Sequence, residues 1–168
     1  MGPVDVGDRF FRAGSVVWQL ESENKYDAIR EVVLRAPVFQ QIDGLDLEEF
    51  AQIVIRRELE LSTGFGHGVA VAHGRTPAVE DSYVALGVSR SGIDYDAPDD
   101  LPVHLLFIVA NHPDQQMDYL KIISTLACLC RSDDFRRELL SSVCRDEIEE
   151  KLGAAFRERI RLPIGSAS

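Results

Sequence analysis

Apolar and polar residues follow two different periods along this chain, and the two periods alternate. Short apolar or alternating runs predict strands, and longer runs with apolar residues three or four positions apart predict helices between them. The predicted strands are residues 16–20, 69–72, 83–89 and 103–110. The predicted helices begin at or just after Asn24, Asp46, Gln115, Ser132 and Asp146. Neither a linker nor a repeat separates these elements, so the pattern predicts one α/β domain.

Polar side chains stand where the predicted helices begin. Asn24 and Ser132 are suitable caps, and Asp46 followed by Glu49 resembles a capping box. Pro37 closes the first helix. In the helix at 115–130, the spacing of apolar residues predicts which face is buried. That predicted inward face consists of Met117, Leu120, Ile123, Ala127 and Cys130.

A glycine-rich segment at residues 62–68 stands at the centre of the pattern. Its three glycines, Gly64, Gly66 and Gly68, allow the backbone to turn tightly where side chains would clash. The small apolar strand at 69–72 follows, and His73 is expected where that strand ends. A histidine in this position reaches solvent while the sheet holds its backbone, which suits a reactive side chain.

The composition narrows the classes of partner. The chain has 168 residues, the size of one domain, with 18 basic and 28 acidic residues and a net charge of −10. This charge repels nucleic-acid phosphates and anionic lipid, so we expect no nucleic-acid partner and no membrane insertion. No secretory signal is visible at the start of the chain. Three cysteines fit no disulfide framework, and we expect a cytoplasmic protein.

The spacing of other residues disfavours several familiar sites. The glycines follow a helix and open a strand, the reverse of a dinucleotide-binding motif, and no Gly-Lys-Ser/Thr follows them. The acidic stretch 92–100 lacks the ligand spacing of a calcium loop, so we expect a solvated loop. Cys128 and Cys130 diverge on a helix and are not expected to bind metal. His104 is predicted to be a hydrogen-bonded residue of a buried strand, and His112 a loop residue.

His73 and Arg57 have the clearest chemical potential. One imidazole nitrogen can attack phosphorus while the other holds a proton, and near neutral pH a useful fraction is unprotonated. An arginine can spread the charge of phosphoryl oxygens without a metal. Arg57 lies on the edge of the apolar sector of its helix. One interpretation is that its guanidinium contacts an anion on the buried side of the helix. The other is that it interacts with the negative end of the helix dipole or pairs with a structural carboxylate. Taken alone, without the surrounding motif, a histidine such as His73 is more often structural than reactive.

The segment Ser62-Thr63-Gly64-x-Gly66-x-Gly68-Val69-Ala70-x-x-His73 resembles the active-site segment of type-2 enzyme IIA domains. These are the fructose/mannitol and nitrogen-regulatory class of the bacterial phosphoenolpyruvate-dependent phosphotransferase system. Further matches to the family are Asn24-Lys25, Arg57-Glu58, Gly92-Ile93 and Pro102-Val103. The similarity covers residues 16–140. It implies a single α/β domain with a mixed β-sheet flanked by helices on both faces.

The resemblance also implies roles and partners. His73 would be the phosphorylated residue, Arg57 would help to hold the phosphoryl group, and Ser62 and Thr63 would shape the pocket. His67, between two glycines, is an accessory candidate. HPr or a nitrogen-type HPr would donate the phosphoryl group, and a IIB domain or a regulatory protein would receive it. No metal and no cofactor are implied.

Two positions depart from the family pattern. Ala72 stands where the family usually has proline before the histidine, which should cost rigidity rather than chemistry. Many sugar-transporting members carry a second histidine just before a leucine at the start of a later helix. Here Tyr119 precedes Leu120, and His112 becomes the alternative if the register contains a gap.

We therefore expect a phosphohistidine carrier, closer to the nitrogen-regulatory branch than to a transporter subunit because no IIB domain or membrane segment is fused to it. The alternative is a regulatory binding module that kept the fold but transfers little phosphate. The predicted organisation is an N-terminal arm at 1–15, the domain at 16–160 and a flexible tail at 161–168.

Overall fold

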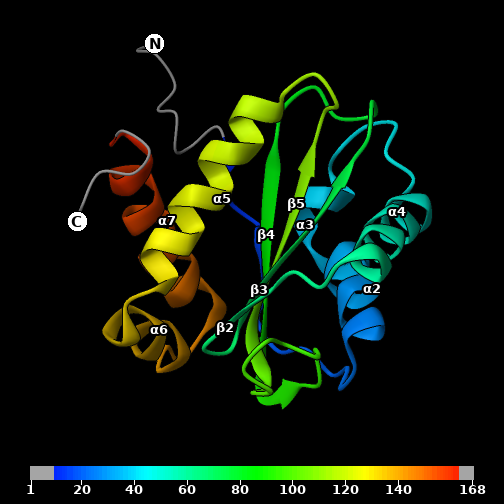
Figure 1. Ribbon diagram of the computed structural model, residues 1–168. Coiled ribbons are helices and arrows are strands. Elements are labelled where there is room, and N and C mark those ends of the chain that lie inside the picture. Colours follow the sequence, from blue (N-terminus) through cyan, green and yellow to red (C-terminus); the bar gives the residue numbers. More distant parts are fainter. Residues whose placement is uncertain (1–9, 163–168) are drawn as a thin grey trace.

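The computed structural model describes residues 10–162, which form a five-stranded sheet between two layers of helices (Figure 1). The strands are β1 (Val16–Val17), β2 (Gly64–Gly66), β3 (Val69–Arg75), β4 (Tyr83–Ile93) and β5 (Val103–Asn111). The helices are α2 (Lys25–Arg35), α3 (Pro37–Gln40), α4 (Leu47–Glu60), α5 (Gln116–Cys130), α6 (Asp133–Leu140) and α7 (Arg145–Ile160).

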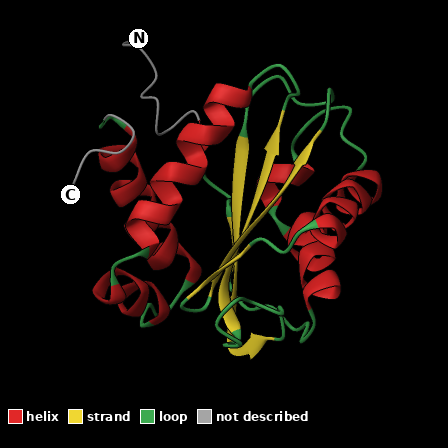
Figure 2. Cartoon of the chain, viewed as in Figure 1, coloured by secondary structure: helices red, strands yellow, loops and turns green. Residues whose placement is uncertain are grey.

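The sheet is mixed, with the strand order β1-β4-β5-β3-β2. β1 pairs with β4 and β3 pairs with β5 in parallel, whereas β4–β5 and β2–β3 are antiparallel. Helices α2, α3 and α4 cover one face, and α5, α6 and α7 lie on the other side (Figure 2). The predicted α/β domain with a mixed sheet flanked by helices on both faces is confirmed.

Side chains of β3 alternate between two apolar cores because successive residues of a strand point to opposite faces. Ala70 and Ala72 belong to the core under α2 and α4. Val69 and Val71 belong to the core under α5 and α7. The neighbouring strand β5 is apolar and buried on both faces, as its sequence predicted. His73 continues the series of Val69 and Val71, so its side chain lies on the α5 side of the sheet.

The predicted helix caps are confirmed. The side chains of Asn24, Asp46 and Ser132 each accept a hydrogen bond from the backbone N–H three residues further on, at 3.0, 3.0 and 3.1 Å. Each bond satisfies one of the N–H groups that a first helical turn leaves without an intrahelical acceptor. The starts of α2, α4 and α6 were therefore readable from single polar residues.

Some predicted boundaries are wrong. β1 ends at Val17 rather than at residue 20, and β4 continues to Ile93, beyond the predicted end at residue 89. The glycine-rich segment contributes a strand of its own, β2, and the short helix α3 begins at Pro37. These differences arise because pairing partners across the sheet, rather than local apolar spacing, decide where a strand ends.

The predicted inward face of α5 is wrong in part. Met117 and Leu120 are 69% and 44% exposed, whereas Ile122 and Leu126 are fully buried. This helix is apolar around most of its circumference, so several faces fit the helical spacing. Contacts with β5 and α7 select the buried face. Two apolar side chains are therefore left exposed on the first turns of α5.

The apolar core begins earlier in the chain than the strands do. Phe10 and Phe11, within the predicted arm at 1–15, are 1% and 3% exposed. The ring of Phe11 lies 6.1 Å from that of Phe156 in α7. Residues 1–9 and 163–168, which include most of the predicted arm and tail, lie outside the described part of the chain. Between residues 10 and 162, no helix combines the length and apolar character needed to cross a membrane.

Candidate functional site

His73 lies inside β3 rather than at its end. The strand continues through Gly74 and Arg75, which pair in parallel with Ala110 and Asn111 of β5. The prediction that the strand ends at His73 is therefore wrong. Gly74 allows α4 to pack closely here, because a Cβ at this position would lie 3.0 Å from carbon atoms of both Phe50 and Val54. The backbone of His73 is thus held by the sheet on one side and by α4 below it.

The imidazole of His73 packs against Tyr119, in the first turns of α5. The Tyr119 hydroxyl lies 3.1 Å from Nδ1 of His73, and the two ring centroids are 4.6 Å apart. His73 is only 7% exposed. The tyrosine therefore holds one ring nitrogen in a hydrogen bond and leaves Nε2 as the nitrogen that a reactant could reach. His112, the alternative candidate, instead accepts a hydrogen bond at Nδ1 from the backbone of Asp114.

Burial and two arginines make His73 a weak base. Loss of hydration on burial, together with the smaller effect of the positive charges of Arg57 and Arg75, lowers the pKa of His73 to about 4. Burial also raises the pKa of Tyr119, against the opposing influence of the same two arginines. The imidazole is consequently neutral at pH 7, with a free electron pair on one ring nitrogen.

Arg57 occupies the last turn of α4, where the helix ends at the edge of the sheet. Its guanidinium lies 3.9 Å from the Glu60 carboxylate, and the two side chains are 38% and 75% exposed. An ion pair this exposed and this long holds a side chain weakly. The buried structural carboxylate that was one interpretation of Arg57 is absent from its contacts within residues 10–162. Its charge nevertheless acts on both His73 and Tyr119.

Thr63 is fixed by a buried carboxylate that sequence reasoning did not single out. Glu58 is 2% exposed and accepts hydrogen bonds from the Thr63 backbone N–H at 3.0 Å and the Thr63 hydroxyl at 2.6 Å. Lys25 Nζ lies 3.4 Å from the same carboxylate. The Tyr95 hydroxyl is 3.1 Å from that of Thr63, and burial, then the Glu58 charge, raises the pKa of Tyr95.

This network ties three parts of the chain together beside the site. Glu58 belongs to α4, Thr63 begins the segment that leads into β2, and Lys25 starts α2. The Thr63 carbonyl in turn accepts a hydrogen bond from the Val71 backbone in β3 at 3.1 Å. Ser62, beside Thr63, accepts a hydrogen bond from the Gly64 backbone at 3.4 Å. Thr63 is therefore a support of the site, with its hydroxyl already engaged.

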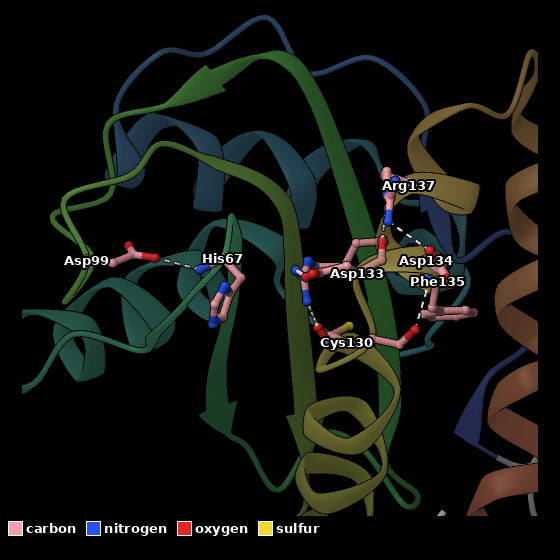
Figure 3. A network of polar contacts seen from close by, with 9 residues as sticks. His67, Asp99, Cys130, Asp133, Asp134, Phe135 and Arg137 are labelled. Atoms are coloured by element: carbon pink, nitrogen blue, oxygen red, sulfur yellow. Dashed lines mark hydrogen bonds and ion pairs between the residues drawn. The ribbon is translucent and has the colours of Figure 1, made fainter.

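His67 is not brought to His73. It forms the turn between β2 and β3 with a φ of 56°, at the opposite end of β3 from the site. Six residues of extended chain correspond to about 20 Å. The His67 backbone N–H donates a hydrogen bond to the Asp99 carboxylate at 2.7 Å, which fastens the turn to the acidic loop (Figure 3). This bond lowers the pKa of Asp99.

The sequence analysis did not single out Glu58 or Arg75, although the sequence contains a signal for each. Glu58 directly follows Arg57, and a carboxylate on the buried side of a helix requires a partner. Arg75 stands two residues after His73, so the alternation of a longer strand would have placed both on one face. Within residues 10–162, no group of three histidine, cysteine or acidic side chains could hold a metal ion.

The fold and the site together define the class of enzyme IIA domains. The nitrogen regulatory protein IIA-Ntr from Neisseria meningitidis superposes with a TM-score of 0.77 at 26% sequence identity, covering 90% of this chain and 98% of that one. The mannitol enzyme IIA from Escherichia coli has the same fold, with a TM-score of 0.67 at 20% identity, over 84% of this chain and 97% of that one.

The sequence profile described as "Phosphoenolpyruvate-dependent sugar phosphotransferase system, EIIA 2" matches residues 9–153. The chain belongs to this family. It is 30% identical to the fructose-specific EIIABC component of Bacillus subtilis over 77% of this chain, but spans only 20% of that relative's length. It is 34% identical to the fructose-specific EIIA component of Haloferax volcanii, over 64% of this chain and 70% of that protein. The Bradyrhizobium diazoefficiens nitrogen regulatory protein is 27% identical over 73% of this chain and 78% of its own length.

The first prediction concerns the protonation of His73. In the folded protein we expect an NMR titration midpoint near pH 4 instead of the ordinary 6.5. Because the unfolded chain takes up this proton first as the pH falls, the contribution of His73 to stability is complete above about pH 6.5 and is lost as the pH falls towards 4. A midpoint near 6.5 in the folded protein would show that the imidazole is neither buried nor influenced by the arginines.

The second prediction concerns Glu58. We expect Glu58→Ala to lower the free energy of unfolding by about 3 kcal/mol, because it leaves the Lys25 ammonium and the Thr63 N–H without their buried partner. Urea denaturation measures this change. Glu60→Ala, on the same helix but exposed, is the matched control and should change stability by less than about 0.5 kcal/mol. Equal losses in both variants would mean that the buried carboxylate is not a structural link.

Proposed function

We propose that this protein is a phosphohistidine carrier, which accepts a phosphoryl group from an HPr-like protein on His73. The observation that carries the proposal is the buried, neutral imidazole of His73, oriented by Tyr119 and exposed to the charge of Arg57. Membership in the enzyme IIA family supports it, since the names of the relatives place them in the phosphotransferase system. The nucleophile needs no base, because it is already unprotonated at neutral pH.

The transfer is balanced without loss of a proton from either partner. Nε2 of His73 attacks phosphorus, while the bond between phosphorus and the donor's ring nitrogen breaks and its electron pair returns to the donor imidazole. Each ring keeps the proton on its other nitrogen. The transfer uses the tautomer of His73 that has its proton on Nδ1, and the Tyr119 oxygen, 3.1 Å away, is placed to accept that proton. In this tautomer Nε2 is free to react.

Arg57 supplies charge for the transferred group. Phosphoryl transfer proceeds with negative charge spread over three equatorial oxygens, so catalysis depends mainly on positioning and on stabilising that charge. The Arg57 guanidinium is held only weakly by Glu60, and therefore can turn towards a phosphoryl group on His73 at little cost. Thr63, whose carbonyl bonds the Val71 backbone of β3, is kept in place through Glu58 and would, with Ser62, steady the edge of the sheet beside His73.

The group would then pass to a IIB domain or serve as a signal to a regulatory protein. A solved relative of this fold is a complex of mannitol enzyme IIA with phosphorylated enzyme IIB, and other relatives are nitrogen regulatory proteins. Both outcomes require a protein to dock over His73. Met117 and Leu120, exposed on the first turns of α5 beside Tyr119, offer apolar contacts for such a partner. The cytoplasm is the compartment in which donor and acceptor would meet.

A second candidate function is a regulatory binding module that transfers little phosphate. Tyr119 favours it, because a phenol contacts His73 where many sugar-transporting members have a second imidazole. A neutral hydroxyl stabilises a phosphoryl dianion less well than a protonated imidazole does. The two candidates differ in the rate of transfer rather than in the fold.

The third prediction is direct and tests the proposal. Incubation with phosphoenolpyruvate, enzyme I and an HPr-type carrier should add one acid-labile phosphoryl group, visible by intact mass. His73→Ala should remove it, whereas His112→Ala should retain it. Labelling that persists in His73→Ala would assign the reaction to another residue, and unlabelled wild-type protein would favour the binding module.

The fourth prediction concerns Arg57. Arg57→Lys keeps a positive charge but loses the planar fork that bonds two phosphoryl oxygens together. We expect phosphorylation to slow by about tenfold, the equivalent of one charge-assisted hydrogen bond, with an unchanged urea midpoint. Arg56→Lys, an exposed neighbour on the same helix, is the control. Identical rates in both variants would leave Arg57 as a helix-end residue.

The fifth prediction concerns Tyr119. The Tyr119 hydroxyl, whose oxygen accepts the Nδ1 proton of His73, can still donate its own proton to a phosphoryl oxygen. Replacing tyrosine with histidine exchanges this neutral donor, worth about 1 kcal/mol, for a charged donor worth about 1.5–3 kcal/mol. Tyr119→His should therefore accelerate phosphorylation by roughly tenfold at pH 6, with a smaller gain at pH 8, where the new imidazole is neutral. Tyr119→Phe, which loses the hydroxyl but keeps the ring, should be slower than the wild type. Three identical pH–rate profiles would remove Tyr119 from the site.

A further inference from the structure

Arg75 lies on the same face of β3 as His73, two residues further along the strand. Side chains of a strand repeat their direction every second residue, so the series Val71, His73 and Arg75 points towards α5. The pairing of β3 with β5 continues without a break to Arg75, opposite Asn111. The Cα atoms of the two residues are therefore about 7 Å apart, a distance that an extended arginine side chain can span.

The guanidinium of Arg75 has no ion pair or hydrogen bond with any of residues 10–162 in the structure, and the side chain is exposed. Most other arginines of this part of the chain are engaged. Arg30, Arg35 and Arg137, for example, pair with acidic side chains on helix surfaces. An exposed arginine beside a buried imidazole is thus available to bind an anion at that imidazole.

Arg57 and Arg75 approach His73 from different elements, α4 and β3, and both charges lower the pKa of His73. Neither charge is neutralised nearby by a close carboxylate, since the Glu60 partner of Arg57 is exposed and 3.9 Å away. A phosphoryl group on Nε2 would place a charge of about −2 between these two cations. The resting site therefore has an excess of positive charge that a bound phosphoryl group would balance.

Asn111, which lies opposite Arg75 in the sheet, offers a hydrogen-bond acceptor that has no donor in the described part of the chain. Asn111 is 1% exposed, and its side-chain oxygen has no hydrogen-bond partner among residues 10–162. A guanidinium has five N–H donors on a rigid plane. The Arg75 guanidinium can therefore donate to the Asn111 side-chain oxygen along one edge and to phosphoryl oxygens along another.

We infer that Arg75 is a second phosphoryl-binding residue, whose guanidinium donates hydrogen bonds to the oxygens of the phosphoryl group on His73. The inference rests on the proposed function and deepens it. Arg75 makes no covalent bond and releases no proton; phosphorus moves from the donor's ring nitrogen to Nε2 of His73. Together, Arg57 and Arg75 hold the equatorial oxygens from two sides.

The test compares Arg75→Ala and Arg75→Lys with Arg56→Ala, which removes the same charge from an exposed position that does not influence His73. Two phosphoryl donors are used: the HPr-type carrier and phosphoramidate, a small donor that requires no protein docking. We expect Arg75→Ala to lower kcat by about tenfold or more with both donors, with little change in KM for the carrier, and Arg75→Lys to be intermediate. Arg56→Ala should match the wild type.

A second readout does not depend on phosphorylation. Because the Arg75 charge disfavours protonation of His73, Arg75→Ala should raise the NMR titration midpoint of His73, and Arg56→Ala should leave it unchanged. An unchanged midpoint together with a wild-type rate in Arg75→Ala would overturn the inference. A rise in KM for the carrier alone, with normal labelling by phosphoramidate, would also overturn it by making Arg75 a docking residue.

The two proposals fail in different ways. If the wild type is not labelled by either donor at His73, the proposed function fails, whatever the midpoint of Arg75→Ala. If the wild type is labelled and Arg75→Ala is labelled equally fast, the phosphoryl-binding role of Arg75 fails while the carrier function stands.

Discussion

The parallel pairing of β3 with β5 is the constraint on which the site depends. Because β5 is buried on both faces, it can neither shift nor fray, and β3 is held against it for seven consecutive residues. His73 and Arg75 acquire their common direction from this pairing. α5 returns over the same face, which brings Tyr119 to the imidazole. A strand that ended at His73 would have left both the histidine and the arginine free to turn into solvent.

The edge strand β2 needs a second constraint, and the buried Glu58 provides it. β2 is only three residues long and its pairing with β3 is irregular, so the ladder alone would hold it poorly. The Glu58 carboxylate holds Thr63 by a hydrogen bond, and the Asp99 carboxylate holds the turn at His67 in the same way. Both carboxylates accept backbone N–H bonds, which immobilises the chain rather than a side chain. The backbone at Thr63 and at the His67 turn is therefore fixed by hydrogen bonds, whereas Arg57 is partly exposed and Arg75 is exposed.

Burial and charge act on His73 in the same direction. Both disfavour the imidazolium, so the imidazole is neutral at pH 7 and would need no general base in the proposed transfer. The same two arginines, which disfavour protonation of the imidazole, would attract an incoming phosphoryl dianion. One electrostatic arrangement would thus serve both the resting state and the proposed phosphorylated state.

The sequence by itself determined most of the elements and pointed to His73 as the candidate residue. Single polar residues at helix starts, the apolar run of β5 and the glycine-rich segment before His73 are local signals, because caps, turns and two-sided burial each depend on a few neighbouring residues. The tertiary structure alone decided the length of β3, the buried face of α5, the contacts of Glu58 and Asp99, and the direction of Arg75. Their partners are distant in the sequence, 33 residues in the case of Lys25 and Glu58, or lie on another strand, as with Asn111. The local spacing of apolar residues does not predict such pairings. A long apolar helix can pack on its sheet in several orientations, and only its contacts with particular neighbours select one.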